Sequence, residues 1–204
     1  MSLPHLGQDV NAPVVRAITT HYAGCRFRSR LEARWAVFFD ELAIPWEYEV
    51  QGFVVEGTPY LPDFWLPYLN LYYEVKPEAL LSDYRDRLAL LAEGGKRRVV
   101  MASGNIPRPD TFYPGTADRN PGFFMETYYP DGNLDESHAW CRCDGCGVTG
   151  IEYLGYADRL LGCGCDFAEQ EDPRRAGAYH PDILRAYETA RSRRFEHGEN
   201  GRAR

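Results

Sequence analysis

Long apolar runs and lysine are both scarce in this chain of 204 residues. No run approaches the ~18 consecutive apolar residues that span a membrane, and residues 1–11 lack the basic start and apolar stretch of a secretory signal. We therefore expect a cytoplasmic protein with no membrane partner. Only two of the 23 basic residues are lysine, Lys76 and Lys96. Lysine in place of arginine at position 76 is therefore informative.

Disorder is also excluded, because 44% of the residues are hydrophobic and 14% are aromatic. The length favours one main fold with a small appendage. The net charge of −7 argues against a general nucleic-acid coat. Residues 101–167 hold ten acidic and four basic side chains, whereas residues 1–100 hold thirteen and eleven. Any basic surface must therefore be local.

A first helix is predicted from Ser29 onward. Ser29 is suited to the N-cap, Glu32 stands three residues later as its capping-box partner, and Pro45 marks the end. The apolar residues fall at i, i+4, i+7, i+8 and i+11, which is one face of a helix: Leu31, Trp35, Phe38, Phe39 and Leu42.

Strands and a second helix are predicted next. Short aromatic or β-branched stretches indicate strands, and the period of Tyr84, Leu88 and Leu91 indicates a helix that Gly94 and Gly95 stop. The predicted order is helix, three strands, helix, strand. Its segments after the first helix are strands at 47–50 with 53–55, at 60–66 and at 71–76, a helix at 82–93 and a strand at 98–102.

Two carboxylates and a lysine fall on neighbouring strands of this pattern. Glu74 and Lys76 share one side of their strand, because side chains i and i+2 point to the same face. A hairpin partner can place Asp63 beside Glu74. Two carboxylates make an oxygen site that Mg²⁺ prefers. A neighbouring ammonium can hold the attacking water and offset charge on a phosphoryl transition state.

Pro62-Asp63 and Glu74-Val75-Lys76, on this order of elements, resemble the PD-(D/E)XK nuclease superfamily over about residues 22–102. The resemblance implies an α/β fold with a restriction-endonuclease-like core, in which helices flank a mixed sheet. It also implies an endonuclease that hydrolyses DNA with Mg²⁺ or Mn²⁺, bound by Asp63 and Glu74, and with Lys76 as a catalytic residue.

Residues 28–35, Arg-Ser-Arg-Leu-Glu-Ala-Arg-Trp, look like the first-helix glutamate motif of phage-type resolvases and transposon-end nucleases. By this likeness Glu32 is a third metal ligand or orients a water, and Arg28 and Arg30 contact backbone phosphates. The likeness further implies branched or recombining DNA as substrate, a homodimer, and the cytoplasm of a bacterial or phage-infected cell.

Simpler interpretations stand beside these. A capping box explains Glu32 without a metal, and a surface ion pair explains Glu74 with Lys76. The alternative function is a non-catalytic module that binds nucleic acid or protein on a nuclease-like scaffold. The side-chain chemistry also suits RNA, and Glu49 is a possible further acidic neighbour that the sequence does not decide.

Five of the six cysteines lie in residues 138–167. Cys143 and Cys146 form a C-x-x-C turn followed by glycine, and sixteen residues separate them from the C-x-C turn of Cys163 and Cys165. Four thiolates on two turns suit tetrahedral, structural Zn²⁺. The pattern looks like a zinc ribbon, although C-x-C departs from it. Two nearby side chains are alternative ligands, Cys141 and His138.

The zinc-ribbon-like module is acidic, which favours a protein partner over phosphate contact. Arg191–Arg194 are interpreted first as the cationic end of a last helix at 181–196, with nucleic-acid contact as the alternative.

The chain divides accordingly into five segments. These are an arm at 1–20, the nuclease-like core at 21–106, a linker with an additional strand at 107–137, the zinc-ribbon-like module at 138–167, and a helix and tail at 168–204.

Overall fold

The computed structural model describes residues 17–78, 82–109, 123–136, 138–153, 163–165 and 177–195. The predicted arm up to residue 16, the linker at 110–122, much of the second half of the cysteine-rich segment and the tail from 196 lie outside these residues. None of the described helices is both long and apolar enough to cross a membrane.

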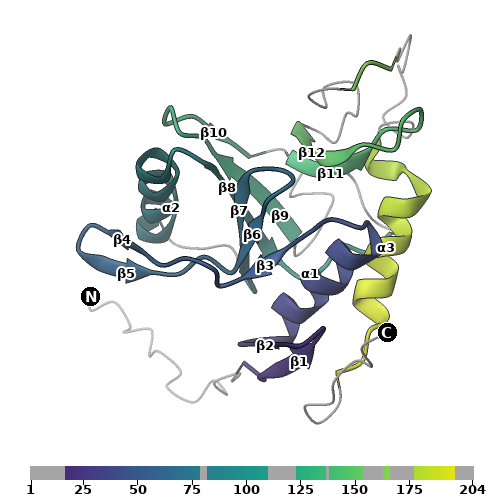
Figure 1. Cartoon of the computed structure of the whole chain (residues 1–204), viewed down its shortest axis with the longest axis horizontal. Coiled ribbons are helices and arrows are strands. Elements are labelled where there is room, and N and C mark those ends of the chain that lie inside the picture. The colour runs from purple at the N-terminus through teal and green to yellow at the C-terminus, as the bar shows by residue number, and fades with distance from the viewer. Residues whose placement is uncertain are drawn as a thin grey trace, which may run out of the picture.

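A mixed sheet of six strands forms the centre of the fold, in the order β10-β9-β8-β7-β6-β3 (Figure 1). Strands β7 and β8 run parallel, with α2 between them in the chain, and the other neighbours are antiparallel. The elements of this sheet and its first two helices are α1 (Arg30–Glu41), β3 (Glu47–Tyr48), β6 (Phe64–Leu66), β7 (Leu71–Lys76), α2 (Ser82–Gly95), β8 (Arg98–Gly104), β9 (Phe123–Tyr128) and β10 (Leu134–Asp135).

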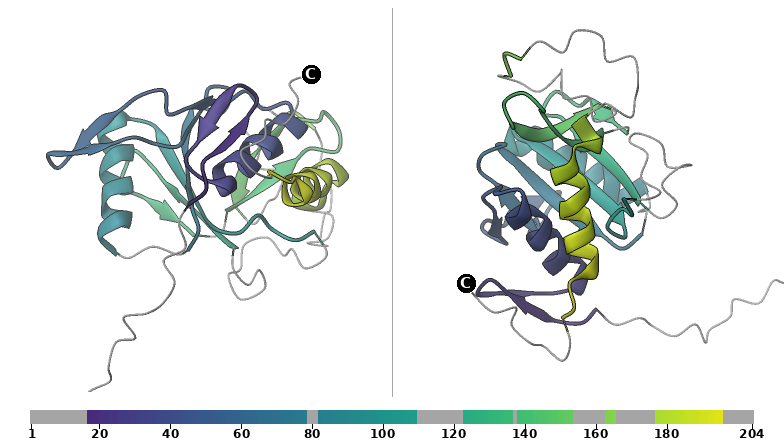
Figure 2. Two further views of the ribbon diagram at one scale, coloured as in Figure 1. Left: turned by 90° about the horizontal axis from the view of Figure 1, so that it is seen from below. Right: turned by 90° about the vertical axis from the view of Figure 1, so that its right-hand side faces the viewer.

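The two faces of the sheet are covered by different helices. Figure 2 shows α2 on one side and α1 with α3 (Pro181–Ser192) on the other. Strand alternation supplies both cores: Tyr73 and Val75 pack on the α1 side, whereas Tyr72 packs with Leu88 of α2. Glu74 and Lys76 alternate with Tyr73 and Val75, and they therefore belong to the α2 side of β7.

Helix α1 begins as the capping-box pattern predicts. Ser29 is extended, at φ −139° and ψ 160°, and its Oγ accepts the N–H of Glu32 at 3.2 Å. The buried face of α1 consists largely of aromatic rings. The ring centroids of Trp35 and Tyr73 lie 5.1 Å apart, and Phe38 stacks on Tyr187 of α3 at 4.7 Å. These contacts fix α1 against both the sheet and α3.

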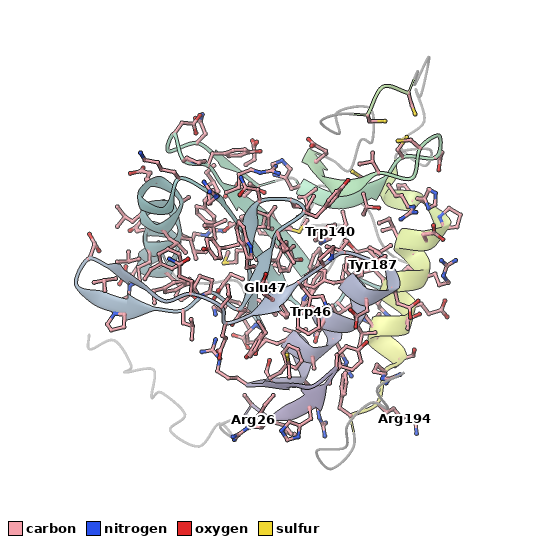
Figure 3. The ribbon with its side chains drawn as sticks, viewed as in Figure 1. Arg26, Trp46, Glu47, Trp140, Tyr187 and Arg194 are labelled. Atoms are coloured by element: carbon pink, nitrogen blue, oxygen red, sulfur yellow. The ribbon has the colours of Figure 1, made fainter. Side chains whose placement is uncertain are left out.

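The cysteine-rich hairpin shares this core. Strands β11 (His138–Arg142) and β12 (Thr149–Tyr153) form an antiparallel pair. Trp140 of β11 is fully buried, contacts Phe38 and donates its Nε1–H to the Tyr73 hydroxyl at 3.3 Å. Figure 3 shows Trp140 and Tyr187 on the α1 and α3 side of the molecule. The predicted core and the predicted zinc-ribbon-like segment are therefore joined by packing.

Several predicted strands are shorter than expected, and each shortening has a local cause. Strand β3 ends at Tyr48, because Glu49 takes a left-handed φ of 49°. The predicted strand 60–66 divides at Pro62, which cannot donate a ladder hydrogen bond. Its first part pairs as β5 (Thr58–Tyr60) with β4 (Phe53–Val55) in a separate hairpin.

The structure also departs from the sequence prediction near the two ends of the described chain. A hairpin that the sequence analysis did not predict, β1 (Thr20–Tyr22) with β2 (Cys25–Phe27), precedes α1. Helix α3 ends at Ser192, because Arg193 returns to an extended conformation at φ −60° and ψ 121°. A short 3-10 helix, η3 (Gly177–Tyr179), precedes α3.

Candidate metal and phosphodiester site

Asp63 and Glu74 lie side by side where β6 begins next to β7. The backbone N–H of Asp63 donates to Glu74 Oε2 at 3.2 Å, and the backbone N–H of Val75 donates to Asp63 Oδ2 at 2.8 Å. Both carboxylate side chains are 2% exposed. The antiparallel register of β6 and β7 thus brings the predicted pair together, and backbone amides hold each carboxylate in place.

Lys76 completes the predicted set. Its Nζ forms an ion pair with Glu74 and lies 4.0 Å from Asp63 Oδ2. Burial alone would lower the pKa of Lys76, but Glu74 and Asp63 outweigh it and the pKa is raised. Lys76 is therefore a protonated ammonium at neutral pH. It also lies 5.0 Å from the ring centroid of Tyr84, whose hydroxyl donates to Glu74.

Burial, and after it the neighbouring Glu74, raise the pKa of Asp63 to about 8. Lys76 acts in the opposite direction, and Glu32 adds to the rise. The ionised pair is thus under repulsion, and it favours taking up a proton or a cation.

Glu32 lies at the first turn of α1 with its hydrogen bonds occupied. Its Oε1 accepts the Ser29 hydroxyl at 2.7 Å, and its Oε2 accepts the Tyr48 hydroxyl at 2.5 Å and the backbone N–H of Arg28 at 3.1 Å. Ser29 is the N-cap of α1, and the Glu32 carboxylate bonds to its hydroxyl and to the Arg28 amide, so local hydrogen bonds hold Glu32 without a metal. Its charge nevertheless reaches Asp63, so Glu32 contributes to the electrostatics of the same cluster.

Arg28 bridges two carboxylates of the cluster. Its Nη2 lies 2.7 Å from Asp63 Oδ1, and its Nε lies 2.7 Å from Glu49 Oε1. The Arg28 side chain is 57% exposed, so a turn toward solution is sterically open. The structure therefore adds Glu49 to the cluster. Arg30, the other predicted phosphate contact, lies in an arginine-lined pocket instead.

The cluster contains more carboxylates than cations. Four carboxylates face two cationic side chains, which leaves two formal negative charges when all four are ionised. Carboxylate oxygens are ligands of the kind that Mg²⁺ accepts, but among the described residues no three carboxylates bring their oxygens close enough together to form a metal site. The members are Glu32, Glu49, Asp63 and Glu74, with Arg28 and Lys76.

A second candidate site is formed by the predicted cysteine quartet. The Sγ atoms of Cys143, Cys146, Cys163 and Cys165 all lie within 4.8 Å of one another, and all four cysteines are free thiols. Four thiols so placed could hold a metal ion such as zinc. The turn is tightly packed, because a Cβ at Gly145 would lie 2.9 Å from the Cys165 Sγ.

Cys143 is prepared for ligation. Burial opposes ionisation of Cys143, but hydrogen bonds from the backbone amide of Cys146 and from the Cys163 thiol outweigh it and lower its pKa to about 6. The two alternative ligands point elsewhere: Cys141 lies 3.7 Å from the Gly150 carbonyl, and His138 faces Tyr129.

The sequence analysis missed the partners that hold these groups. Tyr48, Tyr84 and the Arg28 bridge depend on contacts 10 to 35 residues apart in the chain. No short motif encodes such contacts.

Comparison of the chain with protein-family models, curated proteins and solved structures yields no match.

Proposed function

We propose that this protein is an endonuclease that hydrolyses DNA phosphodiester bonds with Mg²⁺ or Mn²⁺. The observation that supports it most is the buried pair of Asp63 and Glu74, cross-bonded through backbone amides, with the Lys76 ammonium against both. An ordinary surface hairpin needs no buried pair of carboxylates. Because burying two like charges costs free energy, such a pair is typical of a functional site.

Each member would have a separate role. Asp63 and Glu74 would hold the cation, which when bound supplies charge neutralisation and polarises the scissile phosphate. Lys76, kept protonated by the same carboxylates, would orient the attacking water and offset charge on the phosphate oxygens. Glu32 would act as a positioning residue, because its hydrogen bonds to Tyr48 and to the Arg28 amide fix the start of α1.

Arg28 would exchange partners when the cation binds. In the structure it neutralises Asp63 and Glu49, and the cation would take over that task. The exposed guanidinium would then be available for a phosphate oxygen, as the resemblance implies.

The reaction is a hydrolysis with a closed balance. The water oxygen forms a bond to phosphorus, and one ester P–O bond breaks. One proton of the water ends on the leaving oxygen, which becomes a hydroxyl group, and the other ends on the phosphate monoester. No oxidant, reductant or further substrate is required.

The alternative is a non-catalytic module that binds nucleic acid or protein on a nuclease-like scaffold. The Arg28 ion pair with Asp63 favours it, because a cation of the chain already neutralises that carboxylate.

For the cysteine quartet we propose structural Zn²⁺, since four thiolates leave no open position for water. The acidic surface of this segment then suits a protein partner, and a homodimer follows from the likeness to resolvases.

Incubation with plasmid, single-stranded and four-way-junction DNA tests the proposal. The purified chain should cut at least one of these with Mg²⁺ and none with EDTA. Preference for the junction would support branched DNA as substrate. Absence of cutting on all three, with tight binding to any, would favour the non-catalytic module.

A further inference from the structure

An arginine-lined pocket lies where the start of α1 meets the end of α3. Its volume is about 470 Å³, and five arginines line it with Ser192 and Phe195. Arg30 and Arg34 come from α1, whereas Arg191 comes from α3. Figure 1 shows that these two helix ends lie together at one side of the molecule. Residues more than 150 positions apart in the chain thus converge on one cavity.

Three arginines of this pocket, Arg30, Arg34 and Arg191, have no acidic partner among the described residues. The Nε of Arg34 is buried and has no hydrogen-bond partner within the described ranges. Burial, together with Arg191 and Arg30, lowers the pKa of Arg34. Such convergence of cations costs free energy that a bound anion would offset.

Helix electrostatics do not explain the cluster. Cations at the end of α3 interact favourably with the negative end of that helix, which accounts for Arg191. Arg30 and Arg34 occupy the first turns of α1, where the helix end is itself positive. Two arginines and a helix N-terminus of the same sign therefore face the arginines of α3, and the packing of Phe38 on Tyr187 holds the two helices together.

The chemistry of the pocket selects phosphate. The guanidinium fork matches phosphate oxygens with paired, charge-assisted hydrogen bonds. Arg30 and Arg34, four residues apart, share one face of α1, whereas Glu32 between them projects from the opposite face. Glu32 meets Tyr48 beside the acidic cluster, so α1 presents one face to the cluster and another to the pocket.

We propose that the arginine-lined pocket binds a backbone phosphate of the DNA that the acidic cluster is proposed to cut. This inference rests on the proposed nuclease function and deepens it. The pocket would set the register of the strand and would contact no base, so its effect should be independent of DNA sequence.

Binding of labelled duplex DNA, measured by fluorescence anisotropy over a series of salt concentrations, tests the pocket. The full chain with Asp63→Asn is used in Mg²⁺, so that DNA is not consumed. Arg34→Gln and Arg191→Gln should each weaken binding roughly tenfold and reduce the slope of log K against log salt by about 1. Arg87→Gln, at an exposed arginine of α2, should change neither.

Circular dichroism confirms folding of each variant, and Arg34→Lys, which keeps the charge, should retain more of the salt slope than Arg34→Gln. Equal binding by Arg34→Gln, Arg191→Gln and Arg87→Gln would overturn the proposal, as would absence of DNA binding by the parent chain. A rise in thermal transition with inorganic phosphate that Arg34→Gln abolishes, without a change in DNA affinity, would identify a small-anion site and also overturn it. Pocket-dependent binding by a chain that never cuts DNA would support the pocket and contradict the nuclease.

Discussion

Lys76 is the residue whose identity is most informative, because the chain uses arginine for 21 of its 23 basic positions. Its ammonium contacts Glu74 and reaches Asp63 from one narrow position, with Tyr84 on its other side. A planar guanidinium is larger and offers a different donor geometry. Lysine at this position is therefore what the proposed role beside a crowded phosphate requires, whereas a requirement for charge alone would not favour it over arginine.

Lys76→Arg should preserve DNA binding but lose cleavage by on the order of 10²-fold or more, the usual effect of removing a positioned electrostatic group. Single-turnover cleavage at saturating Mg²⁺ measures this loss directly. If the lysine serves only as a surface ion-pair partner of Glu74, arginine will sustain the same rate and Lys76 leaves the mechanism.

The raised pKa of Asp63 gives a prediction in pH. A carboxyl group whose pKa is higher in the folded than in the unfolded protein makes the metal-free fold less stable as pH rises through about 8. A divalent cation competes with the proton, so the rise in thermal transition on adding Mg²⁺ should be small well below pH 8 and larger above it.

Thermal melts with and without Mg²⁺ across this range test the prediction, and Asp63→Asn should remove most of the Mg²⁺ effect. An equal Mg²⁺ effect at all pH values would show that Asp63 does not bind the ion.

The hairpin of β11 and β12 is the element that positions the cysteine quartet. Cys143 directly follows β11, and its backbone N–H donates to the Val148 carbonyl at 2.9 Å before β12 begins. This closure turns Cys143 and Cys146 toward the C-x-C turn. The departure from a C-x-x-C spacing therefore does not prevent four sulfur atoms from meeting.

One zinc ion per chain is expected in protein purified without chelator. Cys143→Ser and Cys163→Ser should each reduce zinc content and solubility, whereas Cys141→Ser, whose thiol faces Gly150, should do neither. Elemental analysis decides the ligand set: full zinc in Cys163→Ser together with loss in Cys141→Ser would reassign it.

Helices were predicted from the sequence more closely than strands. Ser29 fixes the start of α1 locally, and the predicted apolar period includes the buried aromatic residues Trp35, Phe38 and Phe39. The limits of β3 and β6 depend on the left-handed φ of Glu49 and on Pro62, next to a carboxylate that bonds across to β7. Such limits arise from tertiary contacts, which a local pattern does not contain.

The candidate site was likewise predictable from the sequence only in part. Asp63, Glu74 and Lys76 follow from strand alternation and a hairpin. The Arg28 bridge and the convergence of Arg34 with Arg191 do not, because they require α1 to be docked on the sheet and on α3.

Packing joins the cysteine-rich hairpin to the rest of the molecule through Trp140. This side chain is fully buried, and its ring contacts Phe38, Phe39 and Tyr73. The hairpin, α1 and the sheet therefore meet in one hydrophobic cluster.

Trp140→Ala should destabilise the whole chain by about 3–5 kcal/mol, the usual cost of deleting a buried tryptophan. Chemical denaturation measures the change. Trp65→Ala, at a partly buried tryptophan on the α2 side, is the matched control and should cost less. If Trp140→Ala unfolds only the β11–β12 hairpin and leaves the main unfolding transition unchanged, Trp140 does not couple the hairpin to the sheet.

The central claim is that the acidic cluster where β6 begins next to β7 cuts DNA with a divalent cation, and single-turnover plasmid cleavage tests it most directly. The parent chain should cut with Mg²⁺ and stop with EDTA. Asp63→Ala and Glu74→Ala should each abolish cutting with the thermal transition intact or raised, since each relieves the repulsion within a buried carboxylate pair. Glu47→Ala, at an exposed glutamate of β3, should cut normally. Robust cutting by Asp63→Ala or Glu74→Ala, free of contaminating nuclease, would contradict the account.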